Sequence, residues 1–155
     1  MDNKSIYFTQ KKFDEVWGRV TGNEPSDSDT LKIMMEYEYT DWYIYSTLAK
    51  KHTGELRTRF LEMAKDEQRH FRMLNARYYM LTGHKHTAKK PENLVYSSVS
   101  ELLLIRYKTE REASSGYLRA ADETRTADIC ALYRANAADE EKHARILLYL
   151  LGNAI

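Results

Sequence analysis

The sequence FLEMAKDEQRH, residues 60–70, places a glutamate and a histidine three residues apart within a helical pattern, at Glu67 and His70. A second stretch, ANAADEEKH at residues 135–143, repeats this spacing with Glu140 and His143. Residues three apart share one face of an α-helix, so each pair can direct one oxygen and one nitrogen to a common point. The repeated Glu-x-x-His predicts that both pairs face the interior of one helical bundle.

Four stretches of the sequence carry apolar residues at the three- and four-residue intervals of an amphipathic helix. They extend from Leu31 to Ala49, from Leu56 to Leu81, from Leu103 to Ala121 and from Ile129 to Leu151. Ser28 or Asp29 is the expected N-cap of the first helix, and Gly83 is the expected end of the second. No stretch alternates with a period of two, so we expect an all-α protein without strands.

Each Glu-x-x-His motif has a glutamate in the helix before it. Glu38 and Glu110 interrupt the apolar stripes of the first and third stretches, which places both carboxylates on core-facing sides. Glu36 is an alternative in the first stretch, but its face holds polar neighbours such as Lys32, and Glu112 is the weaker alternative in the third. We therefore expect Glu38 and Glu110 to point into the bundle.

The four stretches form an internal duplication, visible when Glu67 is aligned with Glu140. With one residue of slippage in the inter-helix turn, the alignment also matches Glu38 with Glu110 and Tyr45 with Tyr117. A polar segment, GHKHTAKKPEN at residues 83–93, separates the two halves. Two similar hairpins joined by a long crossover between helices 2 and 3 predict an antiparallel four-helix bundle.

Four carboxylates and two imidazoles in one interior are difficult to explain by packing alone, because buried charge must be neutralised or matched. Two carboxylates about 4 Å apart repel by roughly 4 kcal/mol at an effective dielectric of about 20. Two divalent cations would balance this charge, and oxygen and nitrogen donors without thiolate suit iron, with manganese or zinc as substitutes. The predicted metal ligands are Glu38, Glu67, His70, Glu110, Glu140 and His143.

Two further pairs of residues are placed to support these ligands. Asp66 and Asp139 directly precede the Glu-x-x-His glutamates, and a metal-bound histidine usually gives its second N–H to a carboxylate or carbonyl. Tyr45 and Tyr117 each follow an upstream glutamate by seven residues, two helical turns along the same face. They can hydrogen-bond a ligand or carry an oxidising equivalent, with core packing as the alternative role.

The bulk composition limits the class of protein. A chain of 155 residues with 43% hydrophobic content suits one domain, expected at residues 29–155, after a short helical extension at residues 1–28. Its 24 basic and 23 acidic residues are interspersed, so neither nucleic acid nor a membrane is an expected partner. The start lacks an apolar leader, which predicts a cytoplasmic protein. The single Cys130 excludes a four-cysteine iron site, so electrons must come from an external donor.

The six predicted ligands, in their order and spacing, resemble those of the ferritin-like di-iron carboxylate superfamily over roughly residues 30–152. The two motif stretches are most similar to the rubrerythrin and bacterioferritin branches, in a form that lacks a rubredoxin domain. The resemblance implies one Glu-x-x-His for each metal ion, with the upstream glutamates as terminal or bridging ligands. It also implies that each aspartate orients the histidine of the other repeat, pairing Asp66 with His143 and Asp139 with His70.

The sequence departs from that family pattern in three places. Rubrerythrins usually carry a cysteine-bound iron in the same chain, which one cysteine cannot form. Their third helix tends to add a glutamate three residues from the first, but Tyr107 and Ala113 stand at those positions here. Cage-forming relatives add a short fifth helix, whereas this chain stops at GNAI, so we do not expect a large storage shell.

The resemblance implies a di-iron oxidoreductase that reduces peroxide or dioxygen, supplied with electrons by a rubredoxin-like protein or a reductase. One alternative is a ferroxidase or iron-binding protein without a large cage, and another is an oxidase for an organic substrate near Tyr45 and Trp42. Apolar surface on the N-terminal segment and exposed tyrosines favour a homodimer. His84 and His86 in the crossover are expected to be solvated.

Overall fold

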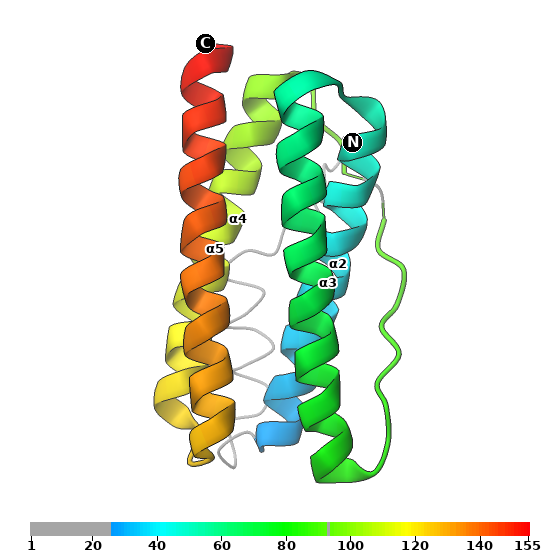
Figure 1. Cartoon of the computed structure of the whole chain (residues 1–155), viewed down its shortest axis with the longest axis vertical. Coiled ribbons are helices and arrows are strands. Elements are labelled where there is room, and N and C mark those ends of the chain that lie inside the picture. The colour runs from blue at the N-terminus through cyan, green and yellow to red at the C-terminus, as the bar shows by residue number, and fades with distance from the viewer. Residues whose placement is uncertain (1–25, 93) are drawn as a thin grey trace, which may run out of the picture.

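The computed structural model describes residues 26–92 and 94–155, and within them it contains four helices and no strand. The helices are α2 (Asp27–Lys51), α3 (Gly54–Thr82), α4 (Val99–Glu123) and α5 (Ala127–Ala154). Figure 1 shows α2 and α5 running in one direction and α3 and α4 in the other, so the crossover after α3 returns along the length of the bundle. The predicted antiparallel four-helix bundle with a long crossover is confirmed.

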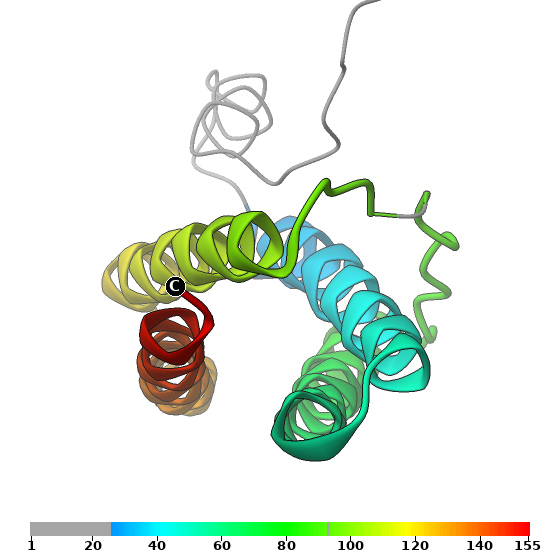
Figure 2. The same ribbon diagram turned by 90° about the horizontal axis from the view of Figure 1, so that it is seen from above.

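Two hairpins form the bundle, α2 with α3 and α4 with α5 (Figure 2). The buried apolar residues fall into two clusters toward opposite ends. One includes Leu31, Leu74 and Tyr133, and the other includes Leu48 and Phe60 among its largest members. The polar residues that interrupt the helical stripes lie between these clusters. The duplication therefore places a charged layer midway along an otherwise apolar core.

The helix ends follow local sequence signals, with one correction. The prediction that Ser28 or Asp29 caps the first helix was wrong, because Ser26 is the N-cap and its Oγ accepts a hydrogen bond of 3.3 Å from the Asp29 N–H. The aspartates of the first turn then lie inside the helix, where negative charge is favourable. Gly83 ends α3 as predicted, with a φ of 74° that a residue with a side chain rarely adopts.

The crossover is fastened to the first hairpin by polar contacts. The Asn75 side chain donates to the His86 carbonyl at 2.8 Å and accepts from its N–H at 3.0 Å. The His86 Nε2 lies 2.6 Å from Glu36 Oε1, so the prediction of a solvated His86 was wrong. Glu36, the alternative ligand in the first helix, therefore contacts His86 at the bundle surface. Residues 1–25 of the predicted N-terminal extension lie outside the described residues.

Candidate metal centre

The structure brings all six predicted ligands together in the middle of the bundle. Glu38 comes from α2, Glu110 from α4, and one Glu-x-x-His from each of α3 and α5. None of the six residues is more than 3% exposed. Helical periodicity therefore identified the inward-facing polar residues, and their convergence follows from the packing of the two hairpins.

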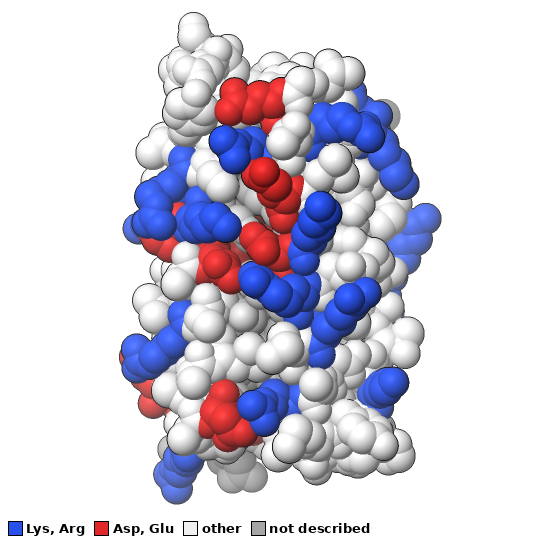
Figure 3. Space-filling model, in the orientation of Figure 1, with Lys and Arg blue, Asp and Glu red and all other residues white. Residues whose placement is uncertain are grey.

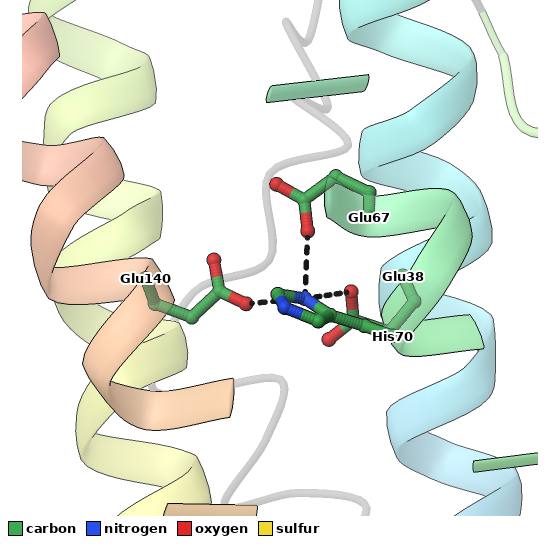
Figure 4. A group of neighbouring side chains, drawn as sticks. All are labelled: Glu38, Glu67, His70 and Glu140. Atoms are coloured by element: carbon green, nitrogen blue, oxygen red, sulfur yellow. Dashed lines mark hydrogen bonds and ion pairs between the residues drawn. The ribbon is translucent and has the colours of Figure 1, made fainter. Parts of the chain in front are cut away.

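One group of candidate ligands surrounds His70 (Figure 4). Its Nδ1 lies 3.1 Å from Glu38 Oε2, 3.2 Å from Glu67 Oε2 and 3.1 Å from Glu140 Oε1. These donors come from three helices, α2, α3 and α5. Their ligating atoms all lie within 4.8 Å of one another, which is compatible with a single cation.

A second group surrounds His143 and shares two members with the first. Its Nδ1 lies 3.0 Å from Glu67 Oε1 and 3.2 Å from Glu140 Oε2, with Glu110 Oε2 farther away at 3.8 Å. Glu67 and Glu140 thus direct one oxygen to each histidine. This is the arrangement that two bridging carboxylates would need between two adjacent cations.

Contacts outside the ligand set hold both imidazoles in one orientation. His70 Nε2 lies 3.1 Å from Asp139 Oδ2, and His143 Nε2 lies 3.2 Å from Asp66 Oδ2. These are the cross-repeat pairs that the resemblance implied. The hydrogen bond to His143 lowers the pKa of Asp66 to about 2, so this carboxylate is ionised at neutral pH and accepts a hydrogen bond from the His143 Nε2–H. Each Nδ1 is then directed inward.

The outer ends of these contacts reach the molecular surface between α3 and α5. Figure 3 shows acidic side chains gathered over this face, with basic side chains beside them. Arg69 Nη2 contacts both aspartates there, at 3.1 Å from Asp66 Oδ1 and 2.7 Å from Asp139 Oδ2. The two aspartates thus contact the Arg69 guanidinium on the outer side and the two imidazoles on the inner side.

Both predicted tyrosines donate to the upstream glutamates, but each reaches the glutamate of the other hairpin. The Tyr45 hydroxyl donates to Glu110 Oε1, and the Tyr117 hydroxyl donates to Glu38 Oε1. Burial raises the pKa of both phenols well above its usual range, so both remain protonated donors. One oxygen of each glutamate is thereby engaged, which leaves the other for the centre.

Sequence reasoning missed two residues beside the centre, Arg106 and Asp41. The Arg106 guanidinium is 2% exposed, and its Nη2 lies 2.7 Å from Glu110 Oε1 and 2.8 Å from Asp41 Oδ2. Its Nε donates to the Tyr45 hydroxyl at 3.2 Å. Arg106 precedes Glu110 by four residues and so shares its helical face, a spacing that could have revealed it.

The cluster holds protons that cations would replace. Burial, together with the charge of Glu67, raises the pKa of Glu140 to about 8. Burial opposes protonation of His70, but the attraction of Glu38 and the contacts with Asp139 and Glu140 outweigh it and raise its pKa. Such protons are the expected response of crowded buried carboxylates to missing counter-charge.

The donor set fits a pair of divalent cations. Among the described residues, Glu67 Oε1, Glu110 Oε2 and Glu140 Oε1 are buried and accept no hydrogen bond, although imidazole nitrogens lie at ion-pair distance. Buried oxygens of this kind normally have a partner. Four carboxylates would balance two divalent charges. The assignment of all six residues as ligands stays a prediction.

Comparison with known proteins agrees with this geometry. The family model of rubrerythrin matches residues 29–151. The chain belongs to the rubrerythrin family. This rubrerythrin-family chain is 33% identical over 115 residues to the uncharacterized protein YhjR of Bacillus subtilis strain 168, an alignment that covers 74% of the chain and 79% of YhjR. The predicted membership of the ferritin-like superfamily is thus confirmed.

Two solved structures are similar to this rubrerythrin-family protein in fold. A bacterioferritin-related protein from Bacteroides fragilis, described as a dodecameric thioferritin, superposes with a TM-score of 0.72 at 20% identity, covering 94% of each chain. A hypothetical protein from Pyrococcus furiosus gives a TM-score of 0.69 at 24% identity, covering 83% of this chain and 91% of that one. At these identities the likeness concerns the fold alone. No helix in the described part of the chain is long and apolar enough to cross a membrane.

Proposed function

We propose that this rubrerythrin-family protein binds two iron ions and reduces peroxide, or dioxygen, with electrons from an external donor. The observation that carries the proposal is the pair of four-residue groups that share Glu67 and Glu140. A carboxylate-rich, thiolate-free set of this kind suits iron, and manganese or zinc could replace it. When bound, the ferrous pair would supply two electrons to peroxide, which with two protons yields two molecules of water.

The chain's own residues would hold the glutamates and manage protons. Tyr45 and Tyr117 are protonated hydroxyls that touch the upstream glutamates, so they can fix one carboxylate oxygen and exchange a proton beside the centre. Asp66 and Asp139 would keep each imidazole oriented for binding through Nδ1. We propose that the tyrosines relay protons during turnover, each hydroxyl accepting a proton as it passes one on, because both are protonated at rest.

A small cavity beside the centre supports a small substrate. Glu38, Glu140 and Tyr117 contribute to its lining, and it has room for about one water-sized molecule. Peroxide or dioxygen needs much less space than an organic substrate. This favours the reduction of a small oxidant over the oxidation of an organic compound.

Rapid mixing of the oxygen-free ferrous protein with peroxide would test the proposal. We expect about one peroxide to be consumed for each pair of ferrous ions, faster than the reaction with dioxygen, and repeated cycles after addition of a reductant. The ferroxidase alternative draws support from the bacterioferritin-related fold neighbour. Accumulation of many ferric ions per chain, without recycling, would favour that alternative and contradict ours.

We also propose that the chain assembles with copies of itself. Several large apolar side chains are half exposed or more, including Tyr79, Met80, Leu148 and Tyr149. Surfaces of this kind often mark an interface. Light scattering coupled to size-exclusion chromatography would give the number of chains, and a monomer at micromolar concentration would contradict the proposal.

A further inference from the structure

The internal duplication provides a comparison within one molecule, because each half should present the same environment to a cation. Glu38 aligns with Glu110, but in the same alignment Arg106 falls on Met34 and Asp41 falls on Ala113. The ion pair between the buried Arg106 and the partly buried Asp41 therefore has no equivalent in the other half. The two ends of the centre differ in charge although the predicted ligands are matched.

The Glu38 end contains a neutral hydrogen-bond donor, the Tyr117 hydroxyl, and a close imidazole. Glu38 Oε1 accepts from the Tyr117 hydroxyl, and Glu38 Oε2 lies 3.1 Å from His70 Nδ1. Met34, which replaces the arginine here, is 2% exposed and belongs to the apolar core. Glu38 thus lacks the arginine that contacts Glu110, and its Oε2 is directed to the interior.

The Glu110 end contains a permanent positive charge. Glu110 Oε1 accepts from Arg106 Nη2 at 2.7 Å as well as from the Tyr45 hydroxyl, and Glu110 Oε2 lies 3.8 Å from His143 Nδ1. The guanidinium is itself fixed, 2.8 Å from Asp41 and 4.7 Å from the centroid of the Tyr45 ring. Glu110 therefore already pairs with the Arg106 guanidinium, which is part of the chain and keeps its charge at any ordinary pH.

We propose that Arg106 makes the two cation positions unequal, so that the position formed by Glu38 and His70 fills before the position formed by Glu110 and His143. The inference rests on the proposed two-metal site. A cation beside Glu110 must compete with the guanidinium for one carboxylate and can use only its Oε2. Charge-assisted hydrogen bonds of this type are about twice as strong as neutral ones. The affinities should differ by at least about tenfold.

Titration of the full-length, metal-free protein with Mn²⁺ tests the inference without measuring activity. Electron paramagnetic resonance distinguishes an isolated Mn²⁺ from a coupled pair, and calorimetry gives the two affinities. At one equivalent, the wild type should show mainly isolated Mn²⁺, with the coupled pair appearing at the second. Glu38→Gln should remove the tight step, whereas Glu110→Gln should leave it.

The decisive variant gives each unmatched position the residue of its partner in the other half, Arg106→Met with Asp41→Ala. Its two affinities should converge to within about threefold. Arg111→Met is the matched control, because Arg111 lies on the same helix but pairs with Glu141 at the surface and should keep both steps unchanged. Circular dichroism checks that each variant is folded.

The outcomes separate this inference from the proposed function. Two Mn²⁺ bound with equal affinity by the wild type would overturn the role of Arg106 and leave the two-metal site intact. Absence of Mn²⁺ and Fe²⁺ binding would overturn the proposed function itself. If the double variant does not fold, the contrast between Glu38→Gln and Glu110→Gln decides, and loss of the tight step in Glu110→Gln would refute the filling order.

Discussion

Glu67 and Glu140 are the residues on which the candidate centre depends most, because each directs one oxygen toward each histidine. Four buried carboxylates repel one another, and in the metal-free protein they are compensated by protons and imidazoles. The same crowding that favours a pair of cations thus makes the empty cluster electrostatically unfavourable. At the scale of single residues, metal binding and protein stability should therefore respond differently to the loss of one ligand.

We expect Glu67→Ala to lose two-metal binding while the bundle stays folded. The loss of metal removes its stabilisation of the bundle. Removing one of the repelling carboxylates offsets part of that loss. Elemental analysis and circular dichroism on the same sample measure both effects. Glu62→Ala, on an exposed turn of the same helix, is the matched control. Two metal ions in Glu67→Ala would count against the predicted ligand set.

We expect Asp139→Ala to weaken metal binding by about 10- to 100-fold, because His70 would lose the acceptor that orients its Nε2. Competition with a chelator of known affinity measures the change. Asp122→Ala is a suitable control, since Asp122 pairs with Arg134 in an exposed contact. Equal losses in the two variants would show that orientation of His70 is not the cause.

At the scale of helices, the position of each end decides which residues face the centre. α2 begins at Asp27 after Ser26, and the packing of the bundle then places Glu38 beside His70 of α3 and in one group with Glu140 of α5. The turn between α2 and α3 needs only His52 and Thr53, with Gly54 at a positive φ of 61°. Short turns keep both helices of a hairpin in a fixed register.

We expect Ser26→Ala to lower the free energy of unfolding by about 1 kcal/mol, because the first turn of α2 would lose its capping oxygen. Thermal denaturation followed by circular dichroism measures it. Ser28→Ala changes a neighbouring serine that is not the cap and should cost less than about 0.5 kcal/mol. A larger effect at Ser28 would mean that the helix begins later than Asp27.

At the scale of the whole molecule, the charged layer links stability to pH. His70 and His143 have raised pKa values, and burial raises the pKa of Glu140 to about 8. From about pH 5 to about pH 8 the folded metal-free protein therefore binds more protons than the unfolded chain, so its stability should fall as pH rises. The lowered pKa of Asp66 changes the pH dependence of stability only below that pH range.

We expect the stability of the metal-loaded protein to increase with pH over the same range. Cations replace the protons of the cluster, and protons compete with them more strongly as pH falls. Melting temperatures measured with chelator and with excess Mn²⁺ would reveal the two slopes. A metal-free melting temperature that increases from about pH 5 to about pH 8 would contradict the predicted protonation of the cluster.

The sequence alone determined the helices, the duplication and the six inward-facing polar residues, because helical periodicity assigns each position to a face. It also indicated the chemistry, since no apolar core accommodates that many carboxylates without counter-charge. The tertiary structure decided which residues of separate hairpins meet: Tyr45 with Glu110, Tyr117 with Glu38, and Arg106 with Asp41. Periodicity places a side chain on its own helix, but contacts across a bundle depend on the packing of helices whose relative positions no local pattern contains.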